Sequence, residues 1–187
     1  MKERIVKAFV EEIEEKGMKF TMDDLAKRIG ISKRTLYEHY SSKQQILEEI
    51  VEQTLTEIDE KTKSILENDE LALIEKIRGV FTVLPAHLEL FDLRILEQMK
   101  RSFPEQWQKI NAALQDDWDE LRGLIEKGIK LGEIADINVG LLMKLFLDSA
   151  NSTLDQRFFA KNNLSVPEAL NGILDILLYG LIPENKR

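Results

Sequence analysis

The sequence predicts an all-α protein in which a three-helix N-terminal head is joined by one long helix to a helical body. Apolar residues recur with helical period along almost the whole chain, and no convincing alternation of apolar and polar residues indicates a strand. Capping-box patterns mark four expected helix starts, at Thr21 with Asp24, Ser42 with Gln45, Ser102 with Glu105, and Ser165 with Glu168. The prediction divides the chain into residues 1–47 and residues 48–187.

The composition limits the classes of protein that fit. The chain has 187 residues, enough for a sizeable core, and it contains no cysteine, which excludes a disulfide scaffold and a thiolate metal site. Its only histidines are His39 and His87, so no metal site or cofactor is expected. Residues 1–12 are too charged for a signal peptide, and no apolar run is long enough to cross a membrane. We therefore expect a soluble cytoplasmic protein without a membrane partner.

The charges are unevenly distributed. The net charge is -8, yet residues 1–47 hold ten Lys or Arg against eight Asp or Glu. Between Lys16 and Lys43 the count is seven basic residues against three acidic ones. An acidic body with one locally basic end would orient the molecule on a polyanion.

Residues 21–43 have the pattern of a helix-turn-helix. Leu25 and Ile29 form the inner face of its first helix, Gly30 suits a left-handed stop, and Ser32 suits the next N-cap. An amphipathic helix over residues 2–16 is expected to brace this pair.

The basic residues of this segment stand at helix starts. Lys33 and Arg34 open the second helix and Lys43 opens the third, although the positive end of a helix normally attracts acidic side chains. A phosphate at these ends would resolve the conflict, and further donors suited to a DNA groove follow at Thr35, Tyr37, His39 and Tyr40. The alternative is a helical hairpin with solvated surface charges.

The same segment resembles the N-terminal signature of the TetR-type transcriptional repressors. The matching residues are Thr21, Leu25, Ala26, Gly30, Ile31, Ser32, Thr35, Leu36, Tyr37, His39, Tyr40, Ser42 and Lys43. The resemblance implies a homodimer that binds a palindromic operator in double-stranded DNA and is released by a small-molecule effector. It also implies that Lys33, Arg34, Thr35 and Tyr37 contact bases, and that Thr21, His39, Tyr40 and Lys43 contact phosphates. Arg34 departs from the small residue often found there, which suggests an operator preference of its own.

The body is predicted to begin within a helix over residues 42–66. This segment keeps its apolar period without glycine or proline, so we expect it to act as a lever between head and body. Further helices are expected over residues 68–84, 86–101, 102–131, 137–160 and 165–182.

A ligand pocket is predicted from mixed aromatic and polar stripes on the body helices. Its candidate residues are Phe81, His87, Phe91, Arg94, Trp107, Trp118 and Phe146. The alternative for His87, Phe91 and Arg94 is a stripe that faces solvent. The alternative for the two tryptophans is the ordinary core.

A dimer interface is predicted from the last two helices. The final helix is apolar nearly all round, so it must be buried on two sides, and a partner subunit is the best source of the second side. The candidate residues are Phe146, Ser149, Ala150, Thr153, Ile173, Leu177 and Leu181.

No arrangement of residues suggests catalysis, because the chain lacks a cysteine nucleophile, a His-Glu metal motif and a phosphate-cradling loop. The leading prediction is a ligand-responsive DNA-binding transcriptional regulator that acts as a repressor. An all-helical protein-interaction module is the main alternative, and a helical lipid carrier is a weaker one.

Overall fold

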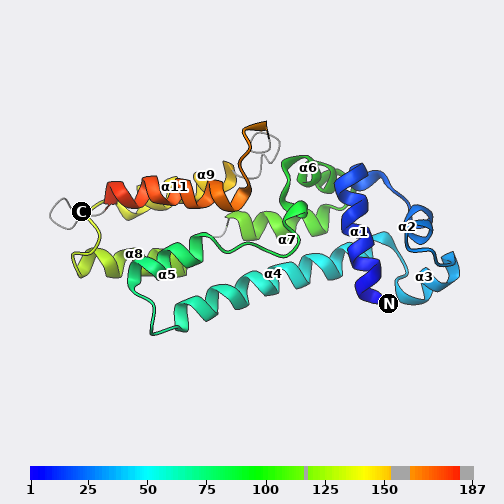
Figure 1. Ribbon diagram of the computed structural model, residues 1–187, viewed down its shortest axis with the longest axis horizontal. Coiled ribbons are helices and arrows are strands. Elements are labelled where there is room, and N and C mark those ends of the chain that lie inside the picture. The colour runs from blue at the N-terminus through cyan, green and yellow to red at the C-terminus, as the bar shows by residue number, and fades with distance from the viewer. Residues whose placement is uncertain (116–117, 153–160, 182–187) are drawn as a thin grey trace. The chain divides into compact units, whose positions relative to one another are not determined.

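The computed structural model describes residues 1–115, 118–152 and 161–181 (Figure 1). All regular structure within these ranges is helical, which confirms the predicted fold class. The first elements are α1 (Lys2–Lys16), the 3-10 turn η1 (Gly17–Lys19), α2 (Met22–Ile29), α3 (Lys33–His39) and α4 (Lys43–Glu67). The later ones are α5 (Leu73–Phe81), the 3-10 turn η2 (Leu88–Phe91), α6 (Leu93–Ser102), α7 (Pro104–Gln115), α8 (Asp119–Lys130), α9 (Val139–Ser152) and α11 (Val166–Leu181).

The chain folds into two compact units. The head unit comprises Met1–Glu57 and Pro85–Ala113, and the body unit comprises Ile58–Leu84 and Leu114–Arg187. The long helix α4 therefore begins in one unit and ends in the other. In the head unit, α6 packs on η1 and η2, so the segment after α5 belongs with the N-terminal helices.

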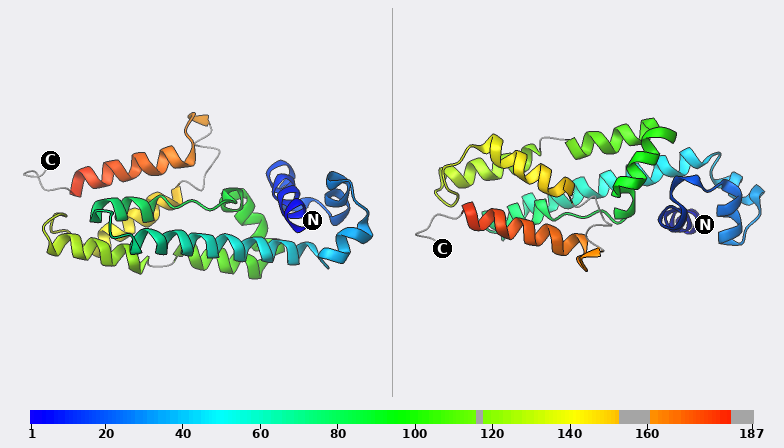
Figure 2. Two further views of the ribbon diagram at one scale, coloured as in Figure 1. Left: turned by 60° about the horizontal axis from the view of Figure 1, so that its bottom comes forward. Right: turned by 90° about the horizontal axis from the view of Figure 1, so that it is seen from above.

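The core of the head unit is built on one face of α1. Ile5, Phe9 and Ile13 repeat at every fourth position and are completely buried. The rings of Phe9 and Phe20 meet edge to face with centroids 5.0 Å apart. Both views in Figure 2 show α1, α2 and α3 gathered near the first turns of α4. This packing gives the short helices α2 and α3 a rigid support.

The body unit is built from α5, α8, α9 and α11, which pack on one another. At Gly128 of α8 an added Cβ would lie 2.7 Å from the side chain of Leu73 and 2.6 Å from that of Ile134. A larger residue would therefore require the ends of these two side chains to shift. Among the described residues no helix has the length and apolar character needed to cross a membrane, and no three acidic or His side chains are grouped as metal ligands.

The local signals predicted in the head are confirmed. Thr21 caps α2 reciprocally with Asp24, since the Asp24 N–H donates to Thr21 Oγ1 (3.2 Å) and the Thr21 N–H donates to Asp24 Oδ2 (2.8 Å). Gly30 adopts the left-handed conformation with φ 74°, which few residues other than glycine accept. Ser32 Oγ accepts the Thr35 N–H at 3.0 Å and so caps α3.

Two predicted body helices are broken, which corrects the sequence analysis. Residues 86–101 form η2 and α6 instead of one helix, because the Asp92 carboxylate accepts the Arg94 N–H (2.9 Å) and starts α6 afresh. The predicted helix over residues 102–131 is divided into α7 and α8, and Trp118, with φ 49°, precedes α8. Its predicted cap, Ser102, is instead the last residue of α6. The two residues between α7 and Trp118 lie outside the described ranges. The predicted stripes through these breaks therefore do not lie on continuous helices.

The start of α5 also differs from the prediction. Asn68 does not cap it; its side chain accepts the Glu70 N–H at 2.9 Å in a turn. The helix begins at Leu73, and the Glu75 carboxylate accepts the N–H of Ala72 at 2.8 Å. Asn68 is therefore part of this turn and is not the N-cap of α5.

Candidate nucleic-acid interface

The helix α3 presents a compact polar face to solvent. Its apolar anchor, Leu36, is completely buried, which fixes the rotation of the helix about its axis. Lys33, Arg34 and Tyr37 are exposed, and these positions (i, i+1 and i+4) lie on adjoining parts of one helical surface. The Arg34 side chain is 90% exposed, so it is accessible to a ligand. The geometry therefore brings together three of the four predicted base-contacting residues.

The cations on this face are paired with carboxylates. Lys33 forms an ion pair with Asp23 of α2, and Arg34 Nε donates to Glu38 Oε1 at 3.2 Å. Exposed pairs of this kind contribute little, about 0.2–1 kcal/mol. A phosphate or a base edge can therefore replace the carboxylate at small cost. The sequence already contained the Arg34 to Glu38 spacing of four residues, although this pairing was not predicted.

Three further predicted DNA contacts of the head are the α2 cap Thr21 and the α3 residues Thr35 and His39. Thr35, the fourth predicted base-contacting residue, is half-buried with its Oγ1 2.9 Å from Ser32 Oγ. Thr21 is exposed, and its hydroxyl donates to Asp24 at 2.7 Å. His39 is half-buried at the end of α3. The hydroxyls of Thr21 and Thr35 thus have partners inside the head.

Tyr40, predicted as a phosphate contact, belongs to the interior of the head. Only 1% of the residue is exposed, and its hydroxyl donates to Glu49 Oε1 at 3.0 Å. Burial, together with the Glu49 carboxylate, raises the pKa of Tyr40 above its ordinary value. Lys2 also binds Glu49, at 2.9 Å. Through Glu49, the Tyr40 side chain therefore links the end of α3 to α4 and to the start of α1.

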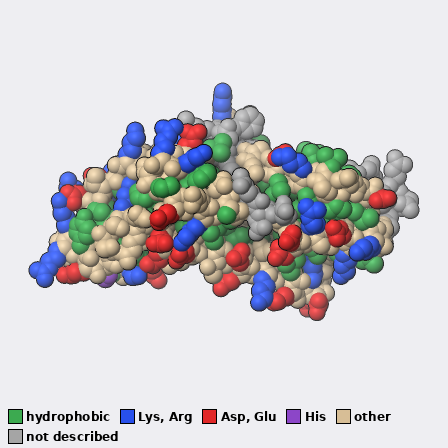
Figure 3. Space-filling model, turned by 180° about the vertical axis from the view of Figure 1, so that it is seen from behind, with side chains coloured by type: hydrophobic (Ala, Val, Ile, Leu, Met, Phe, Trp, Pro, Cys, Tyr) green, Lys and Arg blue, Asp and Glu red, His purple; other side chains and the backbone are tan. Residues whose placement is uncertain are grey.

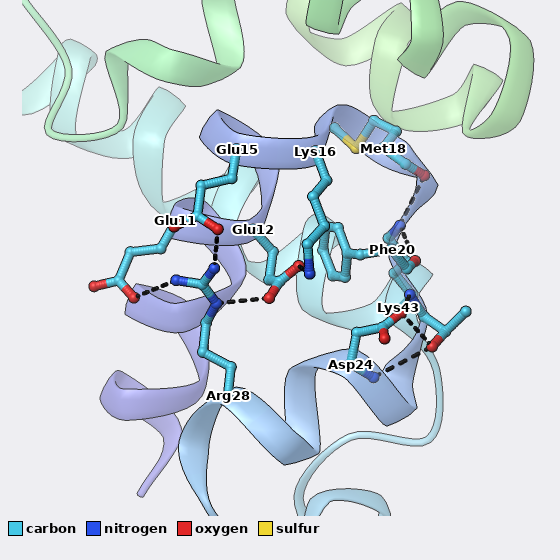
Figure 4. A network of polar contacts seen from close by, with 10 residues as sticks. Glu11, Glu12, Glu15, Lys16, Met18, Phe20, Asp24, Arg28 and Lys43 are labelled. Carbon is cyan, nitrogen blue, oxygen red and sulfur yellow. Dashed lines mark hydrogen bonds and ion pairs between the residues drawn. The ribbon is translucent and has the colours of Figure 1, made fainter.

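Lys43 is likewise turned away from the exposed face. Its ammonium donates to the backbone carbonyls of Met18 (2.9 Å) and Phe20 (2.8 Å) and lies 3.7 Å from the centre of the Phe20 ring (Figure 4). Burial lowers the pKa of Lys43 to about 8, against an opposing effect of the Glu12 and Asp24 charges.

This geometry corrects the argument from cations at helix starts. Carbonyl oxygens at the end of a helical turn carry partial negative charge. The carbonyls of the η1 segment therefore account for Lys43 at the start of α4 without a phosphate. Lys33 and Arg34 are the two predicted cations that remain on the surface.

The comparisons with known proteins agree with this arrangement. The family model described as "Bacterial regulatory proteins, tetR family" matches residues 5–50, from α1 to the first turns of α4. An uncharacterized HTH-type transcriptional regulator of Bacillus subtilis, YvaF, is 32% identical over 186 residues, covering 100% of this chain and 98% of that protein. The chain belongs to the TetR family. The resemblance seen in residues 21–43 is thereby confirmed, and the protein is a helix-turn-helix transcriptional regulator.

A further relative and similar solved structures cover almost the whole chain. The fatty acid metabolism regulator protein of Bacillus subtilis is 25% identical over 185 residues, covering 95% of this chain and 94% of that protein. The ketosteroid regulator KstR2 of Mycobacterium tuberculosis has a TM-score of 0.72 at 18% identity, covering 98% of this chain and 95% of its own. PfmR of Thermus thermophilus has a TM-score of 0.71 at 24% identity, covering 94% and 97%. Both structures share the fold of this chain, and PfmR is described as a TetR-family transcriptional regulator.

The predicted pocket residues of this TetR-family chain separate into two groups. Phe81, Trp118 and Phe146 meet in the body unit, where the Phe81 ring lies 4.9 Å from that of Phe146 and 5.9 Å from that of Trp118, centroid to centroid. The other four predicted residues, His87, Phe91, Arg94 and Trp107, belong to the head unit. His87 lines a cavity of about 550 Å³ between α1, α4 and residues 86–89.

The predicted dimer residues are also only partly grouped. Phe146 is completely buried within the protomer against Phe81, so it is not available to a partner, which corrects the prediction. Ser149, Ala150, Ile173 and Leu177 are half-exposed on α9 and α11. Thr153 and the side chain of Leu181 lie outside the described residues. Apolar residues missed by the prediction are more exposed, namely Leu141 (56%), Leu145 (42%) and Ile176 (76%). Figure 3 shows hydrophobic side chains reaching the surface between charged ones on the face it draws.

Proposed function

We propose that this regulator is a repressor that binds a palindromic DNA operator as a homodimer and leaves it when a small molecule binds. The DNA-binding surface is inferred from one observation. Lys33, Arg34 and Tyr37 are exposed together on a helix whose rotation about its axis is fixed by a buried leucine. Such a helix fits the major groove, with half-sites one or more helical turns apart. We assign base contacts to this trio with Thr35, and phosphate contacts to Thr21 and His39. Tyr40 and Lys43 instead brace the head from inside.

The effector is proposed to be an apolar small molecule bound in the body unit. Supporting observations are the aromatic cluster of Phe81, Trp118 and Phe146, and the ligands of structurally similar regulators. FadR of Bacillus subtilis was solved with stearoyl-CoA (TM-score 0.62, 23% identity), and SmeT with triclosan (TM-score 0.68, 16% identity). An effector can release DNA only if its affinity differs between the DNA-bound and free conformations. In this proposal residues 1–47 bind DNA, residues 48–187 bind effector and partner, and the protein acts in the cytoplasm.

Titration of the chain against mixed-sequence duplex DNA at two salt concentrations tests the proposal. We expect binding that weakens steeply with salt, because each neutralised phosphate contributes about -0.9 to the slope of log K against log salt. A protein-interaction module would give neither binding nor a salt slope. The absence of binding at low salt would overturn the proposed function.

Arg34→Ala is expected to relax the base preference. Fragments selected by the wild type from a random duplex pool define the preferred site. On that site the variant should bind weaker by about 1–3 kcal/mol and lose discrimination at one base pair, as for a bidentate contact to guanine. The matched control is Arg101→Ala on α6, because Arg101 is also exposed and paired at four-residue spacing, with Glu97 at 3.7 Å. An equal loss on every sequence would instead make Arg34 a phosphate contact.

Ile176→Glu is expected to give a monomer. Ile176 is 76% exposed on α11, and the half-exposed Ile173 and Leu177 extend this apolar surface. In a two-fold symmetric interface each residue counts twice, so two buried carboxylates would be introduced together. Sedimentation velocity measures the change. Leu131→Glu is the control, because Leu131 is 56% exposed but lies just after α8. A dimeric Ile176→Glu variant would exclude this surface.

A further inference from the structure

A side chain of α6 binds the backbone of the turn η1. The Met18 N–H donates to Gln98 Oε1 at 2.7 Å, between residues 80 positions apart. Met18 is only 6% exposed, so water does not readily replace this acceptor.

Gly17, the residue before Met18, leaves room for the Gln98 side chain. Gly17 has φ +66°, and a Cβ at this position would lie 2.5 Å from Gln98 Oε1 and 2.9 Å from Gln98 Nε2. The amide of Gln98 therefore occupies space that any other residue at position 17 would fill. Both the conformation and the missing side chain of Gly17 let α6 approach the backbone of η1.

The same turn is held from α4 on its other side. Lys43 Nζ donates to the carbonyls of Met18 and Phe20, as Figure 4 shows, so the residue Met18 is fixed through its N–H by α6 and through its C=O by α4. The turn leads directly to Thr21, which caps α2. The position of η1 therefore sets where the helix-turn-helix begins.

We propose that Gln98 is a positioning residue for DNA binding: through Met18 it fixes the helix-turn-helix relative to α6 and α4. This role rests on the proposed DNA-binding function and adds a specific link from the C-terminal half of the sequence to the head. Loss of the link leaves α3 folded but less often in the orientation that binds DNA, which lowers the apparent affinity by the fraction of competent molecules.

The test compares two substitutions at one position. Gln98→Met keeps the length of the side chain but removes the acceptor, whereas Gln98→Glu keeps an acceptor for the Met18 N–H. We expect Gln98→Met to bind mixed-sequence duplex about tenfold more weakly with an unchanged salt slope, as for one lost hydrogen bond to a buried amide, and Gln98→Glu to restore binding. Gln108→Met on α7 is the control, since Gln108 is exposed in the same unit.

Hydrogen exchange of the Met18 amide in the unmutated chain gives a second measurement. Coupling is reciprocal, so bound DNA should slow exchange at Met18 more than at the amides of α8. A wild type that binds no DNA overturns the proposed function. If the wild type binds DNA, either of two results overturns the role of Gln98 alone. In the first, folded Gln98→Met binds DNA as tightly as the wild type. In the second, DNA does not change hydrogen exchange at Met18.

Discussion

Arg28→Met is expected to lower the free energy of unfolding by clearly more than an ordinary surface substitution, because it removes one partner of a part-buried ion pair whose carboxylate is desolvated. Arg28 Nε donates to Glu12 Oε1 at 2.6 Å, and its other nitrogens bind Glu11 at 3.2 Å and Glu15 (Figure 4). The Glu12 side chain is only 2% exposed and would remain largely desolvated after the substitution. Lys16 at 2.7 Å would still neutralise part of its charge, which limits the expected loss.

The pH dependence of stability provides a separate check. Burial raises the pKa of Glu12, but the hydrogen bonds from Lys16 and Arg28 outweigh it and place the pKa below its ordinary value of 4.5. A carboxylate with a lowered folded-state pKa stabilises the fold fully above its unfolded pKa. This stabilisation is lost as the pH falls through the folded pKa, below 4.5.

Urea unfolding at pH 7 and at successively lower pH measures both effects. Arg28→Met should be less stable at pH 7 and should lose less stability on acidification than the wild type. Lys27→Met is the control, because Lys27 is an exposed residue of the same helix, and surface substitutions change stability by about 0.5 kcal/mol or less. Equal losses for the two variants would show that the Arg28 network does not hold α2 to α1.

The head was predictable because its signals are local. The Thr21 and Ser32 caps and the left-handed Gly30 each depend on residues within three or four positions, and the structure has all of them. The bounds of α1 were also predicted, since one apolar face runs without interruption to Gly17.

The helix breaks in the C-terminal part were not predictable in the same way. Asp92 is one acidic residue among many in the sequence, and only the structure shows that its carboxylate caps α6. Trp118 adopts φ 49° without the glycine or asparagine that usually indicates a left-handed residue. The apolar period continues across both breaks, so periodicity alone joined helices that are separate.

Lys43 shows why the site was harder to predict than the fold. Its position at a helix start is visible in the sequence, but its partners are carbonyls 25 and 23 positions upstream, brought near by the packing of η1 on the rest of the head. A charge that breaks a local rule can be satisfied by a tertiary contact as well as by a ligand. Lys33 and Arg34 differ because their only described partners are exposed carboxylates.

Phe81→Ala is expected to lower the free energy of unfolding by about 3–5 kcal/mol, as for a phenylalanine truncated in a packed core. Phe81 is 2% exposed, and its ring meets those of Phe146 at 4.9 Å and Trp118 at 5.9 Å. The sequence analysis placed Phe81 among the ligand-pocket candidates, whereas its burial in the structure indicates a core residue. A side chain facing an empty pocket has fewer contacts to lose, so its truncation would cost much less.

A double-mutant cycle with Phe146→Ala tests the same point without assuming the absolute loss. Rings in direct contact should show a coupling of about 0.5–1.5 kcal/mol, whereas Phe9→Ala, in the core of the other unit, should add to Phe81→Ala without coupling. A small loss with no coupling to Phe146 would show that Phe81 lines a pocket in the unliganded protein. A large loss with coupling would show that an effector enters this cluster only by displacing packed rings, so that ligand binding itself must change the arrangement of α5 and α9.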